Sequence, residues 1–469
     1  MSGEREQIET IVDRVLGRIR TGSMPATPEL PAHPRGVYKT VSQAVDAART
    51  AQQILINLPL EKRREIIASI RRRAAEDVHT LASMAHEETG LGRVEDKIKK
   101  NLLVIHKTPG VEILEPTAWT GDHGLTLMER APYGVIGSIT PCTNPTETIL
   151  CNGIGMVAGG NTVVFNTHPA AKMTSAYVIN LINNASIEVG GPDNLMCCVE
   201  TPTIASAQEL MTFPGLRLIV VTGGGAVVKA AMNSGKKAIC AGPGNPPVVV
   251  DETADILAAG RDIVRGASFD NNIICTDEKE VFVVDKVADA LMDQMERSGA
   301  VRLRNHQIRR LEKLILTPDR EHINRSWVGQ MPSKMLREID VPFKGDPRLI
   351  IAEVPFEHPF IQLEKLMPVI GITRVRDVNE GIDLAVEAEH GYGHTASMYS
   401  KNLDALHRMA RVINCSIFIK NAPNFAGLGF GGEGFTSFTI ASPTGEGLTT
   451  ARDFTRVRRC TLAGYFRIV

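Results

Sequence analysis

The segment LRLIVVTGGGAVVKAA, residues 216–231, begins with an apolar, β-branched run, passes through three glycines and continues with helix-forming residues. This order is typical of a buried strand, a tight turn and the start of a helix. Such a turn exposes backbone N–H groups at a helix N-terminus, where phosphate groups bind well. Many such turns hold glycine only for close packing, so the segment alone leaves both interpretations open.

Three other short apolar runs resemble the strand in this segment, and helical stretches separate them. They are GVIGSIT at 134–140, NTVVFN at 161–166 and PPVVVD at 246–251. The alternation predicts βαβ units around a buried parallel sheet. From Thr40 to about Leu103 the pattern is helical, and Thr117–Glu129 has the pattern of a β hairpin. A second α/β segment follows, with EVFVVD at 280–285 and MPVIGITRV at 367–375 as strand candidates.

The N-terminal 20 residues are predicted to form an amphipathic helix, because six apolar residues fall on one helical stripe. Residues 21–36 are rich in proline and are predicted to be a linker. The helix would either pack on the rest of its own chain or dock in a groove of another protein. The stripe consists of Ile8, Ile11, Val12, Val15, Leu16 and Ile19.

The composition is that of a soluble globular protein, with 43% hydrophobic residues and a net charge of −1 over 469 residues. We therefore expect no nucleic-acid partner, and no apolar run is long enough for a membrane helix. Eight scattered cysteines without a CxxC pair, and no secretory signal, favour a cytoplasmic, reducing compartment. His390 and His394 are separated by glycines, so no metal site is expected.

Cys275 lies in SFDNNIICTDEKEVFVVD, residues 268–285, between a polar turn and a predicted strand. A nucleophilic thiolate needs partial exposure and positive dipoles nearby, which such a position can provide. A buried, inert cysteine is the competing interpretation of this segment taken alone.

Several motifs occur together in an order that resembles the aldehyde dehydrogenase superfamily over roughly residues 37–469. The resemblance is strongest to the coenzyme A-acylating propionaldehyde and acetaldehyde dehydrogenases of bacterial microcompartments. It implies an α/β fold with a Rossmann-type cofactor domain, a catalytic α/β domain and a β oligomerisation arm. The motifs are GVIGSITPCTNP (134–145), NTVVFNTHPAA (161–171), VTGGG (221–225), CAGPGNPP (240–247), NNIICTDEKEV (271–281), LEKLMPVIG (363–371), GYGHTASMYS (391–400) and GEGFTSFTIASPTGEGLTTARDFTRVRRC (432–460).

The resemblance also implies a division of the chain. Residues 1–20 would be a targeting helix that binds a microcompartment shell protein, and 21–36 its linker. An NAD-binding domain would span 37–250, with 116–133 in the oligomerisation arm of a homodimer or homotetramer. Residues 251–437 would form the catalytic domain, and 438–469 a C-terminal oligomerisation segment. The enzyme would act in the cytoplasm, within a microcompartment.

In that family the cysteine matching Cys275 is the nucleophile, and its acyl thioester passes to coenzyme A after NAD accepts a hydride. The oxyanion would receive hydrogen bonds from the Cys275 N–H and from Asn144. Hydrolytic relatives carry that asparagine one position earlier, where this chain has Thr143. His394 matches a histidine of acylating members and would either deprotonate the coenzyme A thiol or orient its loop.

Ala241 stands where hydrolytic relatives carry the glutamate that activates water, so coenzyme A is expected as the acyl acceptor. A hydrolytic enzyme in which Glu364 replaces that base, and a non-catalytic assembly protein, are the alternatives. In the family the position of Glu364 contacts the nicotinamide ribose. The preference for NAD or NADP stays open, as does the preference for acetaldehyde or propionaldehyde. The remaining cofactor residues would be Ile139, Thr140, Pro141, Asn166, His168, Thr222, Gly223 and Gly224.

Overall fold

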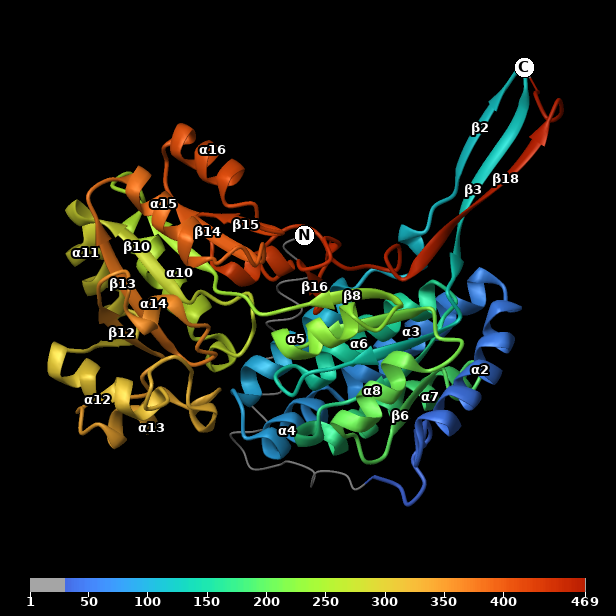
Figure 1. Ribbon diagram of the computed structural model, residues 1–469, viewed down its shortest axis with the longest axis horizontal. Helices are drawn as coiled ribbons and strands as arrows, with labels where there is room; N and C mark the ends of the chain where they lie inside the picture. The colour runs from blue at the N-terminus through green and yellow to red at the C-terminus, as the bar shows by residue number, and fades with distance from the viewer. Residues whose placement is uncertain (1–29, 469) are drawn as a thin grey trace. The chain divides into compact units, whose positions relative to one another are not determined.

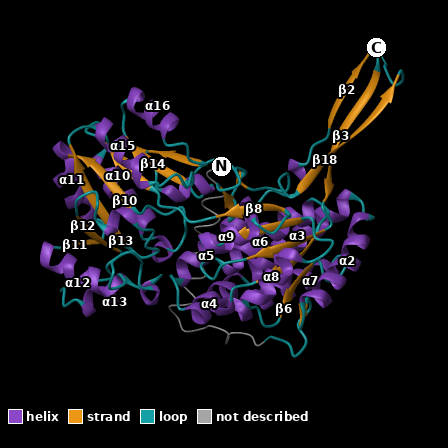
Figure 2. Ribbon diagram, viewed as in Figure 1, coloured by secondary structure: helices purple, strands orange, loops and turns teal. Residues whose placement is uncertain are grey.

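The computed structural model describes residues 30–468, and these form two compact units (Figures 1 and 2). The first unit contains the described chain up to Glu88, then Ile98–Ala241 and the residues from Phe435 onward. The second contains Thr89–Lys97 and Gly242–Gly434. The predicted helix over 1–20 lies outside the described residues. Within them, no helix is both long and apolar enough to cross a membrane.

The first unit is built on a six-stranded, wholly parallel sheet in the order β1-β6-β5-β4-β7-β8. The predicted strands at 134–140, 161–166 and 216–222 are confirmed as β4, β5 and β7. Three strands were not predicted, of which β1 is only two residues long. The bounds are β1 (Val37–Tyr38), β4 (Val135–Ile139), β5 (Thr162–Asn166), β6 (Met196–Val199), β7 (Leu218–Thr222) and β8 (Lys237–Ala241).

Helices precede and connect these strands, as the sequence predicted for residues 40–103. The first of them begins where Thr40 accepts a hydrogen bond from the Gln43 N–H, which caps the helix. Its buried face, which includes Val41 and Val45, packs in one hydrophobic core with strand residues such as Val164. The bounds are α2 (Val41–Ile56), α3 (Leu60–Glu76), α4 (Val78–Thr89), α5 (Val94–Lys107), α6 (Pro145–Ala158), α7 (Lys172–Glu188), α8 (Ile204–Thr212) and α9 (Gly225–Met232).

The second unit is built on a seven-stranded parallel sheet in the order β11-β12-β13-β10-β9-β14-β15. One assignment from the sequence was wrong here. The strand at 246–251 was placed in the cofactor domain, but β9 pairs with β10 and β14 in this second sheet. A short run of β-branched residues suits any buried parallel strand, so its composition does not identify its neighbours.

The strands and helices of the second unit alternate along the chain, as expected for a parallel sheet. The strands are β9 (Pro247–Val250), β10 (Glu280–Val284), β11 (Ala300–Arg302), β12 (Leu349–Glu353), β13 (Val369–Val375), β14 (Thr395–Tyr399) and β15 (Ile417–Lys420). The helices are α10 (Ile256–Ala267), α11 (Asp285–Arg297), α12 (Asn305–Ile315), α13 (Pro332–Glu338), α14 (Pro359–Gln362), α15 (Val378–Ala388) and α16 (Leu403–Val412).

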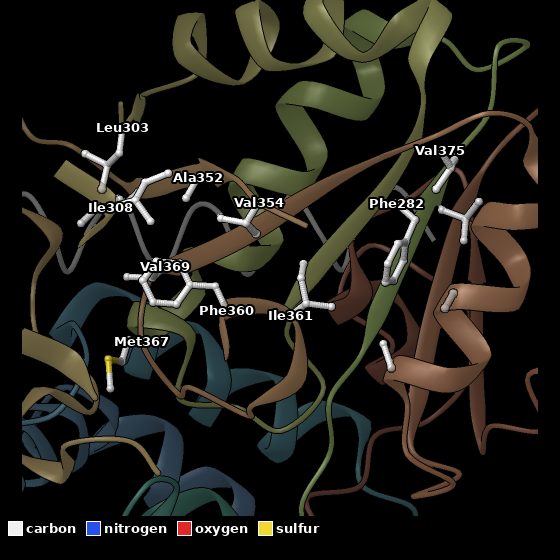
Figure 3. Close-up of a cluster of buried hydrophobic side chains, with 14 of the residues drawn as sticks. Phe282, Leu303, Ile308, Ala352, Val354, Phe360, Ile361, Met367, Val369 and Val375 are labelled. Atoms are coloured by element: carbon white, nitrogen blue, oxygen red, sulfur yellow. The ribbon is translucent and has the colours of Figure 1, made fainter. Parts of the chain in front are cut away.

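A large hydrophobic core covers one face of this sheet, and Figure 3 shows part of it. Phe282 of β10, Val369 of β13 and Phe360 of α14 are almost completely buried there. Strand β10 follows directly on the segment that carries Cys275. The packed core therefore anchors the end of that segment on a rigid strand.

The predicted hairpin is confirmed as β2 (Thr117–Gly121) and β3 (Gly124–Pro132), and β18 (Thr455–Ala463) completes a three-stranded antiparallel sheet (Figure 1). We call β2, β3 and β18 the arm.

Between unit 2 and the arm the chain returns to the first unit, where the Thr444 hydroxyl accepts a hydrogen bond from the Cys240 N–H at 3.0 Å. The remaining elements are β16 (Ile440–Ala441), β17 (Gly447–Leu448) and the 3₁₀ helices η1 (Val111–Ile113), η2 (Pro169–Ala171), η3 (Phe269–Asn272), η4 (Arg325–Trp327) and η5 (Asn424–Leu428).

Candidate active site

The predicted cofactor residues of the first unit lie at the carboxyl ends of three neighbouring strands. Ile139 ends β4, Asn166 ends β5 and Thr222 ends β7. Because β4 pairs in parallel with both β5 and β7, these ends lie at one edge of the sheet. The chain passes from β4 to β5 on one side and later to β7 on the other. In open parallel sheets, ligands bind at such a reversal of strand order.

Polar groups at this edge suit a dinucleotide. The hydroxyls of Thr140 and Thr167 are buried and have no hydrogen-bond partner among the described residues. A Cβ added at Gly224 or Gly225 would meet no atom within 4 Å, so the turn before α9 leaves its backbone open to a phosphate. The orphan hydroxyls and the open helix N-terminus together fit the ribose and phosphate groups of NAD.

Two of the predicted cofactor residues use their side chains in hydrogen bonds within the protein. The Asn166 amide oxygen accepts a hydrogen bond from the Ser206 hydroxyl at 2.5 Å, and its NH₂ group lies 3.5 Å from the Thr203 carbonyl. His168 is exposed, and its Nδ1 accepts from the Ala170 N–H, which caps η2. Their side chains therefore shape the ends of the strand and the following turn.

Asn144 is buried at the N-cap position of α6 and is held by a lysine from α5. The Lys100 ammonium donates to Asn144 Oδ1 at 2.6 Å, and Asn144 Nδ2 lies 3.3 Å from the Thr143 hydroxyl. Lys100 also lies 3.2 Å from the Glu147 carboxylate, and neither of these side chains is exposed. Lys100 was not predicted from the sequence, since a lysine in a charged helix normally faces solvent.

In the second unit, a strained turn precedes Cys275. Asp270, Asn271 and Asn272 have φ values of 45°, 55° and 63°, three consecutive non-glycine residues in the left-handed region. Such residues cost roughly 1–3 kcal/mol each and persist only where the surroundings hold them. They cluster at functional sites, which makes this turn a part of the candidate site.

Buried cations hold the turn in place, so we call Asp270–Asn272 the clamped turn. Lys97 Nζ lies 3.0 Å from Asp270 Oδ2, with both side chains fully buried. The Arg93 guanidinium donates from Nε to Asn271 Oδ1 at 2.9 Å, and the Arg93 backbone N–H donates to Asp270 Oδ1 at 2.6 Å. Lys279 donates to Asn272 Oδ1 at 2.6 Å and to the Ile274 carbonyl at 3.0 Å, next to the predicted nucleophile. The residues that lead into Cys275 are therefore fixed in place.

Cys275 is partly exposed, and its surroundings disfavour the thiolate. Burial and, to a smaller extent, the Glu364 carboxylate raise the pKa of its thiol to about 12, although the Lys279 ammonium opposes them. Cys275 is therefore a thiol at neutral pH. A group that removes its proton, or a change in charge on ligand binding, has to activate it.

Gly244 brings three predicted residues of the second unit together. A Cβ at this position would lie 2.9 Å from the Cys275 carbonyl oxygen and 2.9 Å from His394 Cγ. The Gly244 N–H also donates to Glu364 Oε1 at 3.2 Å. Only a residue without a side chain can occupy this point without displacing Cys275 or His394. Gly244 was part of a motif in the sequence, but its role as their meeting point was not predicted.

His394 is fully buried, with its Nδ1 2.8 Å from the Thr395 hydroxyl. Its Nε2 has no hydrogen-bond partner among the described residues. Burial lowers the pKa of the imidazole to about 3, and the Lys279 charge contributes to the shift. His394 is therefore neutral at physiological pH, and its Nε2 is a buried nitrogen without a partner among the described residues.

Ala241 ends β8 and is buried, and its carbonyl accepts a hydrogen bond from the Gly223 N–H at 3.1 Å. Its methyl side chain offers no proton acceptor. Hydrolytic members of the aldehyde dehydrogenase superfamily, which the motifs resemble, carry glutamate at this position. Water activation by this residue is thus chemically excluded.

Comparisons with known proteins agree with this arrangement. The model of the aldehyde dehydrogenase family matches residues 25–443. The chain is 48% identical over 470 residues to the acetylating acetaldehyde dehydrogenase EutE of Escherichia coli K12, covering 99% of this chain and 100% of that protein. It is also 48% identical to a solved propionaldehyde dehydrogenase from the fucose utilisation microcompartment of Clostridium phytofermentans, with a TM-score of 0.91 over 93% of this chain and 100% of that one. A Rhodopseudomonas palustris propionaldehyde dehydrogenase, solved with bound CoA and an acylated cysteine, is 46% identical with a TM-score of 0.90, over 92% of this chain and 98% of that one.

Proposed function

The chain belongs to the aldehyde dehydrogenase family, and from that premise we propose how its own residues divide the work of the reaction. The enzyme is a CoA-acylating aldehyde dehydrogenase, which converts a short-chain aldehyde, NAD⁺ and CoA into the acyl-CoA, NADH and a proton. The proposal concerns the nucleophile, the oxyanion donors, the thiol base and the cofactor edge.

Cys275 Sγ, once deprotonated, attacks the aldehyde carbon. The Cys275 N–H and Asn144 Nδ2 donate hydrogen bonds to the alkoxide that forms. NAD, when bound, supplies the acceptor for the hydride that the carbon then loses. Cys275 is left holding the acyl group as a thioester. The edge formed by β4, β5 and β7 binds the dinucleotide, and Glu364 contacts the nicotinamide ribose.

His394 takes the proton of the CoA thiol in the second half of the reaction. The neutral imidazole is the form that can accept a proton, and burial maintains that form. The same burial makes a lasting imidazolium costly, so the proton is held only while the CoA sulfur attacks the thioester. Cys275 then leaves as a thiolate and recovers its proton.

The observation that carries the acyl-transfer assignment is Ala241. Without a carboxylate at this position, water is not activated, and the thioester waits for a stronger nucleophile. A CoA thiolate is such a nucleophile. The hydrolytic alternative would need another base, and Glu364, which accepts a hydrogen bond from the Gly244 N–H, is assigned instead to the nicotinamide ribose.

Omitting CoA tests this function directly. Since the thioester accumulates, NADH is expected as a burst of about one per active site, followed by near-arrest, and CoA should restore turnover. Cys275→Ala should abolish the burst while NAD still binds. Steady release of free acid without CoA would contradict acyl transfer, and a burst from Cys275→Ala would remove Cys275 as the nucleophile.

We also propose that the enzyme works inside a bacterial microcompartment on acetaldehyde or propionaldehyde. The similar proteins act on these aldehydes, and one of them comes from such a compartment. Residues 1–20 would bind a shell protein, and the arm would join subunits into a homodimer or homotetramer. Comparing kcat/KM for two- to four-carbon aldehydes would establish the preferred substrate.

A further inference from the structure

A buried cation holds one end of the Asn144 amide. Lys100 and Glu147 are fully buried, and Asn144 is nearly so. The Lys100 ammonium lies 2.6 Å from Asn144 Oδ1, a short, charge-assisted hydrogen bond. The Glu147 carboxylate, 3.2 Å from Lys100, also accepts hydrogen bonds from Asn101 and Thr146. The cation is therefore compensated and firmly placed.

The chemistry of the groups decides which way the amide faces. An asparagine side chain has one accepting oxygen and two donating N–H bonds, whereas a lysine ammonium only donates. Lys100 must therefore face Oδ1, which turns the NH₂ group of Asn144 to the other side. One of its N–H bonds is directed at the Thr143 hydroxyl. Within the described residues, Asn144 Nδ2 donates no other hydrogen bond.

We propose that Lys100 is a positioning residue for the acylation step, one that fixes the Asn144 amide so that it presents a donor and not its carbonyl to the alkoxide. The inference rests on the proposed function, in which Asn144 is an oxyanion donor. A flipped amide would place a carbonyl oxygen against a developing negative charge. A donor that is already aligned stabilises the alkoxide without reorganisation.

A double-mutant cycle tests the proposal. Lys100→Met is made in the wild-type and in the Asn144→Ala background, and the acylation burst is measured by stopped flow. Because one oxyanion donor is worth about 10²–10³ in rate, Lys100→Met should slow acylation at least about tenfold in the wild-type background. In the Asn144→Ala background, where no amide is left to orient, the same substitution should change the rate less than about twofold.

Two further variants keep the test informative. Lys100→Met leaves Glu147 buried without its cation, so the neutral pair Lys100→Met with Glu147→Gln repeats the cycle if the single variant fails to fold. Lys100→Arg keeps a charged donor and should recover most of the rate. Lys236→Met is the matched control, because this half-buried lysine donates to the Phe213 and Leu216 carbonyls and should affect stability without affecting acylation.

The outcomes distinguish the positioning role of Lys100 from the donor role of Asn144. Equal losses from Lys100→Met in both backgrounds would overturn the positioning role while leaving Asn144 as a donor. If Asn144→Ala itself acylates at the wild-type rate, the donor role assigned to Asn144 is wrong and the inference falls with it. Coupling between the two sites, with recovery in Lys100→Arg, would establish the proposal.

Discussion

At the scale of single residues, the site is arranged against early ionisation of its nucleophile. Burial and the Glu364 carboxylate raise the pKa of Cys275, and the Lys279 ammonium opposes them. A thiol that is protonated at rest resists oxidation and unwanted alkylation, since the thiolate is the reactive form. The arrangement therefore keeps the nucleophile inactive until a ligand changes its surroundings.

This balance predicts the effect of Glu364→Gln on the free enzyme. Removing a neighbouring negative charge stabilises the thiolate, so the pKa of Cys275 should fall below about 12. Below that pKa the thiolate fraction grows as the pKa drops. Alkylation of Cys275 by iodoacetamide should then be faster at every pH from about 7 to 10.

Mass spectrometry of the labelled peptide would distinguish Cys275 from the other seven cysteines, eight being present in all. Glu296→Gln, on the exposed side of α11, is the control and should leave the rate unchanged. An unchanged or slower alkylation in Glu364→Gln would contradict the assigned electrostatic coupling.

At the scale of elements, hydrophobic pattern was sufficient for the long helices and for strands such as β4, β5 and β7. It failed for β1 and β11, which have two and three residues, because so few residues show no periodicity. Strand β9 was predicted as a strand but placed in the wrong sheet, since pairing partners are set by tertiary packing.

In the candidate site, too, some residues could be predicted from the sequence and others could not. Motif resemblance located Cys275, His394 and Glu364, which the second unit brings together around Gly244. It did not reveal Lys97 or Lys100, because burial of a lysine depends on the distant carboxylate or amide that receives it. The clamped turn gave no signal beyond its polar residues, since positive φ values are imposed by those long-range contacts.

The clamped turn leads to a prediction about stability. Asp270→Ala leaves the Lys97 ammonium without its buried carboxylate, so urea unfolding should show a loss of about 3–5 kcal/mol. Asp383→Ala removes the partner of Arg408 in an exposed ion pair and should cost less than about 1 kcal/mol. Equal losses in the two variants would show that the buried pair does not hold the turn.

At the scale of the whole molecule, the arm presents strands whose surfaces remain open within the described chain. Strands β2 and β18 form its two edges, and Trp119 and Val457 are 48% and 51% exposed. Their registers with β3 place both residues on the same face. An exposed apolar face beside unpaired strand edges is typical of a subunit interface.

Val457→Asp should therefore weaken the homo-oligomer, because docking would bury a carboxylate without a partner. Mass photometry across a dilution series should show smaller species for this variant than for the wild type. Val457→Ile keeps an apolar side chain at the same position and should leave the mass distribution unchanged. An oligomer of unchanged mass in Val457→Asp would exclude this face from the interface.

The assignment of residues 1–20 as a packaging signal rests on their sequence, because they lie outside the described structure. An apolar stripe from Ile8 to Ile19, followed by a proline-rich segment, suits a helix that docks on a partner. Enclosing the enzyme would also confine a reactive aldehyde.

Deleting residues 1–20 should leave kcat and KM near the full-length values. Fused to a fluorescent protein, the segment should direct it into co-expressed shells, and Ile11→Asp with Val15→Asp should prevent this, since docking would bury two carboxylates. A fusion that stays diffuse beside intact shells, or a truncated enzyme that unfolds, would instead assign the helix to the enzyme's own structure.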